Sequence, residues 1–429
     1  MEEHPAAETG RSATSALALT AASTAARRIT TVLFAAQCLA SAAFIATSTV
    51  SAIAGMALSG QRSLAGVPAA ASTLAGSGAA FLWGMLMDKM GRRPSLALGL
   101  LFGAAGAALC VWGITARSFL VFVGGMMLLG VANAAITLSR FVAAEVNAPE
   151  RRGRAVSTVV LGGTVGAIGG PLLVTPAGHI AMQAGTGDLA GAFGAAVLLL
   201  LTAGAVIAAA LRPEPLTLAG LSTKQAGLNA ERAPRRSISE IFRLPGAAAA
   251  VAAMVFSQAV MVGLMVITSL YMKDMNHGLG DISVVFSAHT IGMYAFSLVS
   301  GRLIDRWGRR QVILLGASVL LVACLTAPLT GNTIPLSVSL LLLGLGWNFC
   351  FVGGSTLLAD HLRPAERGRT QGFNDLLVGL AAALGSLGSG LVSARFGYAG
   401  VGLAGAVLAL VPFVFVARWA RQRARGSAG

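Results

Sequence analysis

The feature of this sequence that most restricts its fold is a succession of long apolar runs that contain almost no charged residues. Only 11% of the 429 residues are charged, whereas about a quarter are charged in a typical soluble domain. The 31 Lys and Arg and the 16 Asp and Glu are too few to give a soluble chain of this length a polar surface. We therefore expect lipid to be the solvent for much of the molecular surface.

Twelve of these runs are long enough for a helix of about 20 apolar residues, which crosses about 30 Å of hydrocarbon. The sequence therefore predicts an all-α integral membrane protein with twelve transmembrane helices. The expected spans are 29–56, 67–87, 95–115, 120–143, 155–182, 189–211, 247–272, 282–303, 311–330, 335–358, 370–395 and 400–417.

The longest polar stretch, 212–246, divides the spans into two sets of six. We expect one six-helix bundle at 29–211 and a second, pseudo-symmetric bundle at 247–417. The polar stretch is expected to be a linker that includes a short amphipathic helix near 237–242.

Lys and Arg are distributed unevenly on the two sides of the predicted membrane. If the tails at 1–28 and 418–429, which are expected to lack regular structure, are cytoplasmic, 26 of the 31 Lys and Arg lie on that side and 4 on the other. This bias follows the positive-inside rule. It predicts a multi-pass protein of the cell inner membrane with cytoplasmic termini. It also accounts for the net charge of +15 without a nucleic-acid partner.

The composition gives no sign of a bound cofactor. The four cysteines lie in apolar stretches without a C-x-x-C pair, which indicates reduced core residues and neither a metal site nor a disulfide framework. The sequence contains no P-loop, so ATP is not an expected energy source. We expect no cofactor, and we expect a monomer in the lipid bilayer.

One loop pattern occurs twice, once in each half. Residues 84–93 and residues 301–310 both read G-x-L-x-D-K/R-x-G-R-R, and each copy follows the second span of its half. A second pair of similar loops follows the fourth span of each half, next to Glu145 and Asp360. An internal repeat of this kind predicts two related bundles with the substrate site at their interface.

The doubled loop resembles the signature of the major facilitator superfamily, and the resemblance extends over about residues 29–417. It implies a transporter that works by alternating access. In such a protein Asp88 and Asp305 are expected to hydrogen-bond the free N–H groups at the start of spans 11 and 5, where the helix dipole also favours a carboxylate.

The same resemblance implies a latch between the halves on the cytoplasmic side. The two loop glycines carry no side chain, so a neighbouring helix can pack closely there. The arginine of each loop is expected to pair with the acid of the adjoining loop. The predicted latch residues are Gly84, Asp88, Arg92, Glu145, Gly301, Asp305, Arg309 and Asp360.

Span 5 contains a stripe of small residues, Gly162, Gly166 and Gly170, followed by Pro171. The last part of this stripe resembles half of the G-x-x-x-G-P motif of proton-coupled antiporters. The two positions that should continue the motif as Gly-Gly are Val-Thr in this chain. The alternative is an ordinary small-residue stripe for helix packing.

Polar residues inside spans are costly in lipid, so each is a candidate for contact with substrate or protons. Arg140 in span 4 is expected to anchor an anion or couple to protons, or else to brace the adjacent loop. Asp375 in span 11 is expected to accept a proton or to support the latch, and His289 in span 8 to relay protons or to pack. The other candidates are Gln37, Asn133, Gln258, Trp347 and Asn348.

The sequence therefore predicts a proton-coupled secondary transporter for a small organic solute. Export of a drug or metabolite is slightly favoured by the partial antiporter motif, the apolar interior and the Met-rich span 7. Uptake of a nutrient such as a vitamin or organic acid is favoured by the incomplete motif and by Arg140. A non-transporting membrane sensor is a remote alternative. An enzyme is not expected, because the ionisable residues within the spans are few and scattered.

Overall fold

The structure, a computed structural model, describes residues 6–147, 151–215, 236–362 and 366–426. Every regular element in this part of the chain is a helix. The first half contains α1 (Ala6–Ser59), η1 (Arg62–Leu64), α2 (Val67–Met90), α3 (Arg92–Thr115), α4 (Phe119–Thr137), α5 (Ser139–Val146), α6 (Arg152–Gly169), η3 (Pro171–Leu173), α7 (Val174–Gln183) and α8 (Asp188–Ala210). The second half contains α10 (Ile238–Arg243), α11 (Pro245–Asp274), α12 (Leu279–Tyr294), α13 (Ser297–Trp307), α14 (Arg309–Thr326), η4 (Ala327–Leu329), α15 (Thr333–Asp360), α16 (Arg367–Ala409) and α17 (Val411–Gly426).

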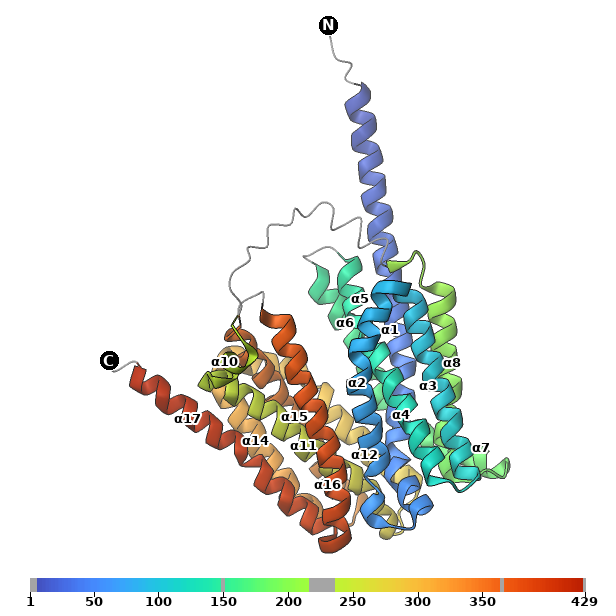
Figure 1. Ribbon diagram of the computed structural model, residues 1–429, viewed down its shortest axis with the longest axis vertical. Coiled ribbons are helices and arrows are strands. Elements are labelled where there is room, and N and C mark those ends of the chain that lie inside the picture. Colours follow the sequence, from blue (N-terminus) through green and yellow to red (C-terminus); the bar gives the residue numbers. More distant parts are fainter. Residues whose placement is uncertain (1–5, 148–150, 216–235, 363–365, 427–429) are drawn as a thin grey trace.

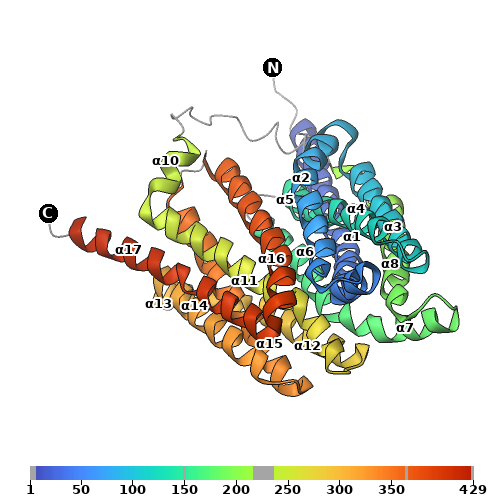
Figure 2. The same cartoon turned by 60° about the horizontal axis from the view of Figure 1, so that its bottom comes forward.

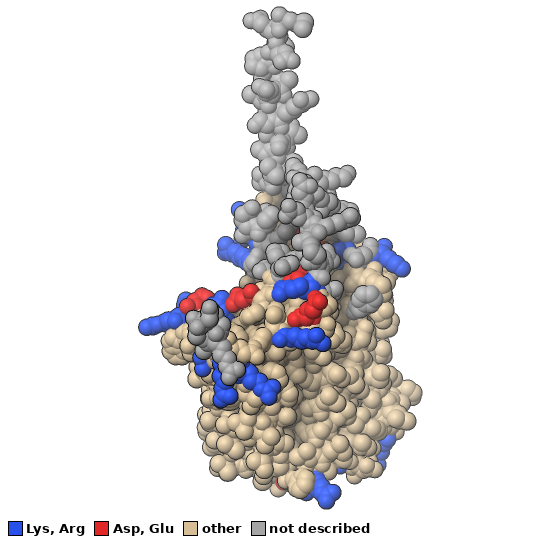
Figure 3. Space-filling model, turned by 60° about the vertical axis from the view of Figure 1, so that its left-hand side comes forward, with Lys and Arg blue, Asp and Glu red and all other residues tan. Residues whose placement is uncertain are grey.

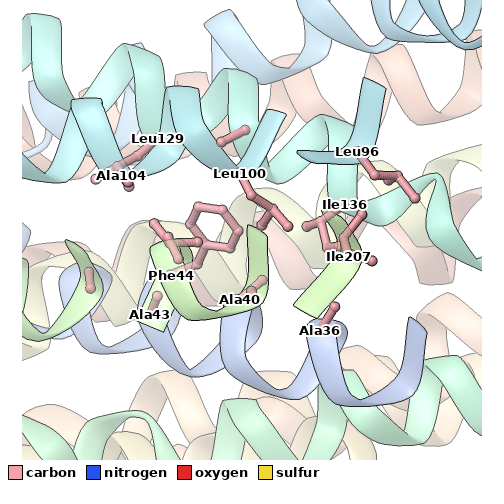
Figure 4. Close-up of a cluster of buried hydrophobic side chains, with 14 of the residues drawn as sticks. Ala36, Ala40, Ala43, Phe44, Leu96, Leu100, Ala104, Leu129, Ile136 and Ile207 are labelled. Atoms are coloured by element: carbon pink, nitrogen blue, oxygen red, sulfur yellow. The ribbon is translucent and has the colours of Figure 1, made fainter. Parts of the chain in front are cut away.

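The helices form two bundles that lie side by side (Figures 1 and 2). In the first bundle α1, α3, α4 and α8 enclose an apolar core, part of which Figure 4 shows. There Leu96 and Leu100 of α3, Ile136 of α4 and Ile207 of α8 meet small alanines of α1. In the second bundle α11, α12, α14, α15 and α16 contribute to a corresponding core.

The two ends of the bundles differ in charge. The end where the linker attaches, which we call the linker end, also carries the loops at residues 88–93 and 305–310 (Figure 1). The far end carries η1 and the turn after α11. Figure 3 shows Lys, Arg, Asp and Glu gathered toward the linker end, above a broad band of the visible face with almost no charge. Leu198, Leu391 and Leu403 are more than 60% exposed, as side chains that face lipid must be.

The number of membrane spans is only partly settled by the described residues. Nine of their helices are long and apolar enough to cross a membrane, and a tenth is the bent pair α12 and α13. α2 occupies the second expected span with 24 residues but is not among these. The helical stretch of α16 covers span 11 and most of span 12, and it bends at Gly397, where φ is +66°. The membrane-helical fold class is confirmed, while the count of twelve stays a prediction.

The two tails are more regular than expected. α1 begins at Ala6 rather than near residue 29, and α17 continues to Gly426. Alanine, the strongest helix former, is abundant before the first span, so the membrane helix extends into the tail. The irregular tails expected from the sequence are therefore wrong within the described residues 6–28 and 418–426.

The linker contains a short helix in the expected place. The Ser237 hydroxyl accepts the Glu240 N–H at 3.2 Å, and the Glu240 carboxylate accepts the Ser237 N–H at 2.7 Å. This reciprocal capping box begins α10, whose Ile241 is buried. The Ser237 N–H holds the pKa of Glu240 below its ordinary value, so the cap stays charged. Residues 216–235 of the linker lie outside the described part of the chain.

The glycine stripe of span 5 lies against the backbone of α1. Gly162 and Gly166 of α6 and Gly170 directly after it each face a main-chain carbonyl, and a Cβ on Gly166 would overlap that oxygen. Pro171, which is buried, then ends α6 by starting η3. The carbonyl partners are those of Phe34, Cys38 and Ala42, which follow one another by one helical turn. The two helices therefore approach each other more closely than any larger side chain would allow.

We predict that Gly166→Ala lowers the melting temperature of the purified protein in detergent. The added methyl group must push α6 away from α1, and such overpacking costs about 1–3 kcal/mol. Gly169→Ala is the matched control, because a Cβ on Gly169 meets no atom within 4 Å. Equal melting temperatures for the two variants would show that the stripe is not a close packing contact.

Candidate functional site

The two bundles meet at the far end through main-chain contacts between small residues. The Ser386 hydroxyl of α16 donates to the Gly66 carbonyl at 2.8 Å, and a Cβ on Gly66 would overlap the Ser386 carbonyl oxygen. Gly390, one turn further along α16, would place a Cβ 2.6 Å from the Ser63 carbonyl oxygen. η1 and the start of α2 are therefore packed directly on α16.

Polar side chains also join the bundles near this end. The Arg62 guanidinium pairs with Asp274 at 2.6 Å and donates to the Ser393 hydroxyl at 3.0 Å. On α12 the Ser287 hydroxyl donates to the Ile168 carbonyl of α6 at 3.1 Å. Because α2 packs on α16, α6 on α12 and α1 on α11, the far end is closed across the whole interface.

The bundles separate toward the linker end. A Cβ on Gly379 of α16 would overlap the Ser77 hydroxyl of α2, and beyond this pair the two helices diverge (Figure 1). A Cβ on Gly84 of α2 or on Gly301 of α13 would meet no described atom within 4 Å. The close helix contact expected at these two glycines is therefore not made here, because the helices that would supply it are apart.

The loop acids are correspondingly disengaged where the structure describes them. Asp305 is exposed and has no hydrogen-bond or ion-pair partner among the described residues. Its expected partner, the start of α6 at Arg152, is described but donates no hydrogen bond to it. The side chain of Asp88 lies outside the described part of the chain. Its backbone lies near the end of α2, three helical turns beyond Ser77, or about 16 Å along the helix axis.

The loop arginines pair with acids of their own bundle. Buried Arg92 at the start of α3 holds Glu145 of α5 with two hydrogen bonds, at 2.9 and 3.1 Å. Arg309 at the start of α14 pairs with Asp360 at the end of α15 at 2.9 Å. These pairs are the ones that the loop sequences favoured. Because each lies within one bundle, it can hold a loop in place but cannot by itself join the two halves.

Two further acids join the linker to the bundles, Glu214 from the linker itself and Glu366 from the segment before α16. The Glu214 carboxylate accepts the N–H groups of Arg92 at 2.5 Å and Arg93 at 3.3 Å, so it caps the start of α3. Buried Glu366, directly before α16, accepts three hydrogen bonds from Arg236 at 2.7–3.1 Å. Those bonds raise the pKa of the Arg236 guanidinium, so the pair stays ionised. No motif marks Glu214, whereas Glu366 lies in the second pair of repeated loops but was not predicted to bind the linker.

Exposed polar side chains line the separated faces. Asn133 and Thr137 lie one turn apart on α4 and are exposed, and so are Gln371 and Asp375 on α16. Asp375 is one turn from Gly379, which touches the first bundle, so it shares the face that α16 turns toward that bundle. Since polar groups facing lipid are costly, these residues indicate a water-filled space between the bundles.

Arg140 lies beside this space. Its guanidinium is near enough to Asp375 of the opposite bundle for electrostatic attraction, but the two side chains form no ion pair or hydrogen bond in the described structure. It also lies 4.9 Å from the centre of the Phe141 ring. Its Nε is buried and has no hydrogen-bond partner among the described residues. A cation with an unused donor can receive an anionic group or change partners during a transport cycle.

An aromatic group with a polar edge lies in the second bundle. The Trp347 ring stacks on Phe351 with centroids 4.9 Å apart, and Tyr294 meets it edge-on at 6.3 Å. The Trp347 indole N–H donates to the Gln258 amide at 2.7 Å. We call these four residues the aromatic group. Trp347 is buried in the core of the second bundle, whereas Phe351, Tyr294 and Gln258 are partly exposed, so a planar ligand would have to meet the edge of this group.

The remaining predicted residues are divided between the bundles. Gln37 accepts a hydrogen bond from Ser139 at 3.1 Å, next to Arg140. His289 is buried between α12 and α15, where its Nδ1 bonds a carbonyl oxygen at 2.9 Å. Asn348 bonds Ser300 and the main chain of α12. Gln37 is thus grouped with Arg140, whereas His289 and Asn348 join helices within the second bundle.

The sequence matches the family model described as Major Facilitator Superfamily over residues 32–284 and 251–429. It is 33% identical over 390 residues to the uncharacterised MFS-type transporter YdeG of Bacillus subtilis, covering 90% of each chain. It is 30% identical over 415 residues to the riboflavin transporter RfnT of Brucella anthropi, covering 94% of this chain and 98% of that one. The multidrug resistance protein MdtL of Escherichia coli matches over 118 residues at 29% identity, covering 27% and 30%.

Among solved structures, the fold is similar to that of a D-xylose–proton symporter. The TM-score is 0.66 at 18% identity, and the match covers 90% of this chain and 97% of that one. At this identity the likeness concerns the arrangement of helices alone.

We predict that Arg62→Gln makes the far end open more often. Both partners of the Arg62–Asp274 pair are about a third exposed, so its loss should change the free energy of far-end closure by no more than about 1 kcal/mol. This corresponds to roughly a fivefold fall in the ratio of closed to open protein. The measurement is the labelling rate of Ala52→Cys, a buried position between the bundles, in a protein without other cysteines. Arg117→Gln, an exposed far-end arginine, is the matched control. A labelling rate unchanged by Arg62→Gln would remove the pair from the closure.

Proposed function

Because the chain belongs to the Major Facilitator Superfamily and is a transporter rather than an enzyme, we propose that it carries a small organic solute by proton-coupled alternating access. The observation that carries this proposal is the asymmetry of the bundle interface. One end is closed by backbone contacts and the other is separated, with polar side chains exposed between the halves. A solute could enter this space from the linker end only.

We infer that the linker end is cytoplasmic. Both ends of the described chain and both ends of the linker lie on this side of the bundles (Figure 1). The basic residues gather at this end, and the positive-inside rule places the side that is richer in Lys and Arg in the cytoplasm. The present arrangement is then the inward-open state, and the opposite state requires the bundles to rock about the central contact between Ser77 and Gly379.

The proposed latch forms when the bundles close at the cytoplasmic end. Asp88 would then reach the start of α16, and Asp305 would reach the start of α6. Each contact between a carboxylate and a helix terminus is worth about 1 kcal/mol, and up to about 3 when it is charge-assisted and partly buried. The ion pairs of Arg92 and Arg309 are present while the ends are apart, so we assign them to holding the loops ready.

Arg140 and Asp375 are the proposed coupling pair. They approach each other from opposite bundles, and Asp375 is exposed to the space between the halves. Protonation of Asp375 would remove its attraction for Arg140 and free that cation for a substrate anion or another partner. This links the charge state of one bundle to the position of the other, as proton coupling requires.

The aromatic group and the relatives together favour a solute with a planar ring. RfnT, which is named a riboflavin transporter, matches this chain over nearly its whole length. The glycines of the partial antiporter motif are accounted for by their contact with α1. We therefore place uptake of a vitamin-like heterocycle first, with riboflavin as the first compound to test.

Export of a drug or metabolite is the second candidate. It is favoured by the segment Gly166 to Pro171, which still has the form of half an antiporter motif, and by the short match to MdtL. The two candidates differ in the direction of net movement under the same proton gradient.

We predict that Arg140→Lys weakens apparent substrate affinity by about tenfold, a loss of about 1.4 kcal/mol, while membrane abundance changes little. Lysine keeps the charge but lacks the planar fork of donors. Transport kinetics normalised to inserted protein provide the measurement, and Arg154→Lys, an exposed arginine of α6, is the matched control. If Arg140 only braces its loop, Arg140→Ala should instead lower abundance and leave the normalised kinetics unchanged.

We predict that proteoliposomes take up labelled riboflavin when the interior is made alkaline, and that a protonophore abolishes this accumulation. Trp347→Ala should raise the apparent KM several-fold through the loss of one stacking ring, which is worth about 0.5–1.5 kcal/mol. Trp112→Ala is the control, because Trp112 is 60% exposed on the outside of α3. Proton-driven loss of riboflavin from loaded vesicles would favour export, and no proton-dependent movement in either direction would remove riboflavin as the substrate.

A further inference from the structure

A pocket of about 660 Å³ lies at the linker end of the second bundle, apart from the space between the halves. Three helix ends form it: the start of α14, the end of α15 and the last part of α17. Its lining includes Arg309, Arg310, Asp360, His361 and Trp419. We propose that this pocket binds the headgroup of an anionic phospholipid of the cytoplasmic leaflet.

The charge of the pocket fits a phosphate. Arg309 is paired with Asp360, but Arg310 is exposed and has no hydrogen-bond or ion-pair partner among the described residues. Arg418 and Arg421, which flank Trp419 on α17, are also exposed. Basic pockets between membrane helices on the cytoplasmic side are suited to anionic headgroups.

The depth of the pocket fits the interface between headgroups and acyl chains. Trp419 lies edge-on to His361 with ring centroids 6.4 Å apart, and tryptophan is enriched at this level of a bilayer. Toward the far end, the outer surfaces of the same helices become apolar. Val322 of α14, Val414 of α17 and Leu410 directly before α17 are about half exposed. A phosphate held by Arg310 would thus have an apolar surface below it for the acyl chains.

The site also contacts the proposed latch. Arg309 lines the pocket and belongs to the second copy of the repeated loop, in which Asp305 is the latch acid. A phosphate beside Arg309 would compete with Asp360 for its donors. Lipid in the pocket would therefore alter how firmly this loop is held.

The test is native mass spectrometry of the purified full chain with phosphatidylglycerol or with phosphatidylcholine of the same acyl chains. Phosphatidylglycerol should be retained in preference. Arg310→Gln should lower its retention by about fivefold, since one arginine near an anionic lipid surface contributes about 1 kcal/mol. Arg310→Lys should keep most of it, and Trp419→Ala should also lower it. Arg243→Gln, which removes an exposed arginine of α10 at the same end, is the matched control.

Equal retention of both lipids, or an equal loss in Arg243→Gln, would overturn the proposal. Displacement of phosphatidylglycerol by millimolar inorganic phosphate would show a free-phosphate site and overturn the lipid assignment. An unchanged melting temperature in Arg310→Gln would exclude unfolding as the cause of the lost lipid retention. If Arg310→Gln is unstable, retention by Arg310→Lys decides instead. The proposal requires that the protein is embedded in a membrane, not that it transports a solute. A negative transport assay would therefore not decide whether the pocket retains lipid.

Discussion

The close backbone contact of α16 with η1 and the residue before α2 is the interaction on which the rest of this arrangement depends. Gly66 and Gly390 have no side chains, so the segment that leads into α2 touches α16 carbonyl to backbone near the far end. Between helices in lipid there is little hydrophobic driving force, and association relies on such close packing and on hydrogen bonds. The contact holds two bundles together at one end and leaves them free to separate at the other.

The repeated loops acquire two distinct roles from this geometry. Their arginines pair with Glu145 and Asp360 inside their own bundles, where the distance does not depend on how far the halves are apart. Asp305 has no partner among the described residues, and the partner proposed for each loop aspartate is a helix start of the opposite bundle. The linker is attached at two points of this end, because Glu214 caps the start of α3 and Arg236 holds Glu366 at the start of α16. The structure thus joins the linker to both loops that would have to meet when the linker end closes.

Sequence reasoning predicted the features that depend on local pattern. Apolar runs predicted the membrane helices, and the doubled loop led to the pairs of Arg92 and Arg309. It missed the contacts of Glu214 and Glu366 and the Arg62–Asp274 pair, because these residues meet others more than 100 positions away. Glu366 lies in a repeated loop, but the repeat does not indicate its partner. The open surroundings of Gly84 and Gly301 could not be predicted either. The surroundings of these two glycines depend on how far apart the bundles are, and one sequence is compatible with both the separated and the closed arrangement.

The central claim is that the linker end opens and closes under control of the loop aspartates. Spin labels at Lys89→Cys on α2 and Gln371→Cys on α16, both exposed, would measure the separation of that end by pulsed electron resonance in a protein without other cysteines. We expect two distance populations, a longer one that corresponds to this structure and a shorter one that is lost when Asp88 and Asp305 are changed to Asn. A single distance that the Asp88→Asn and Asp305→Asn changes leave unaltered, in the presence and absence of a proton gradient, would contradict it.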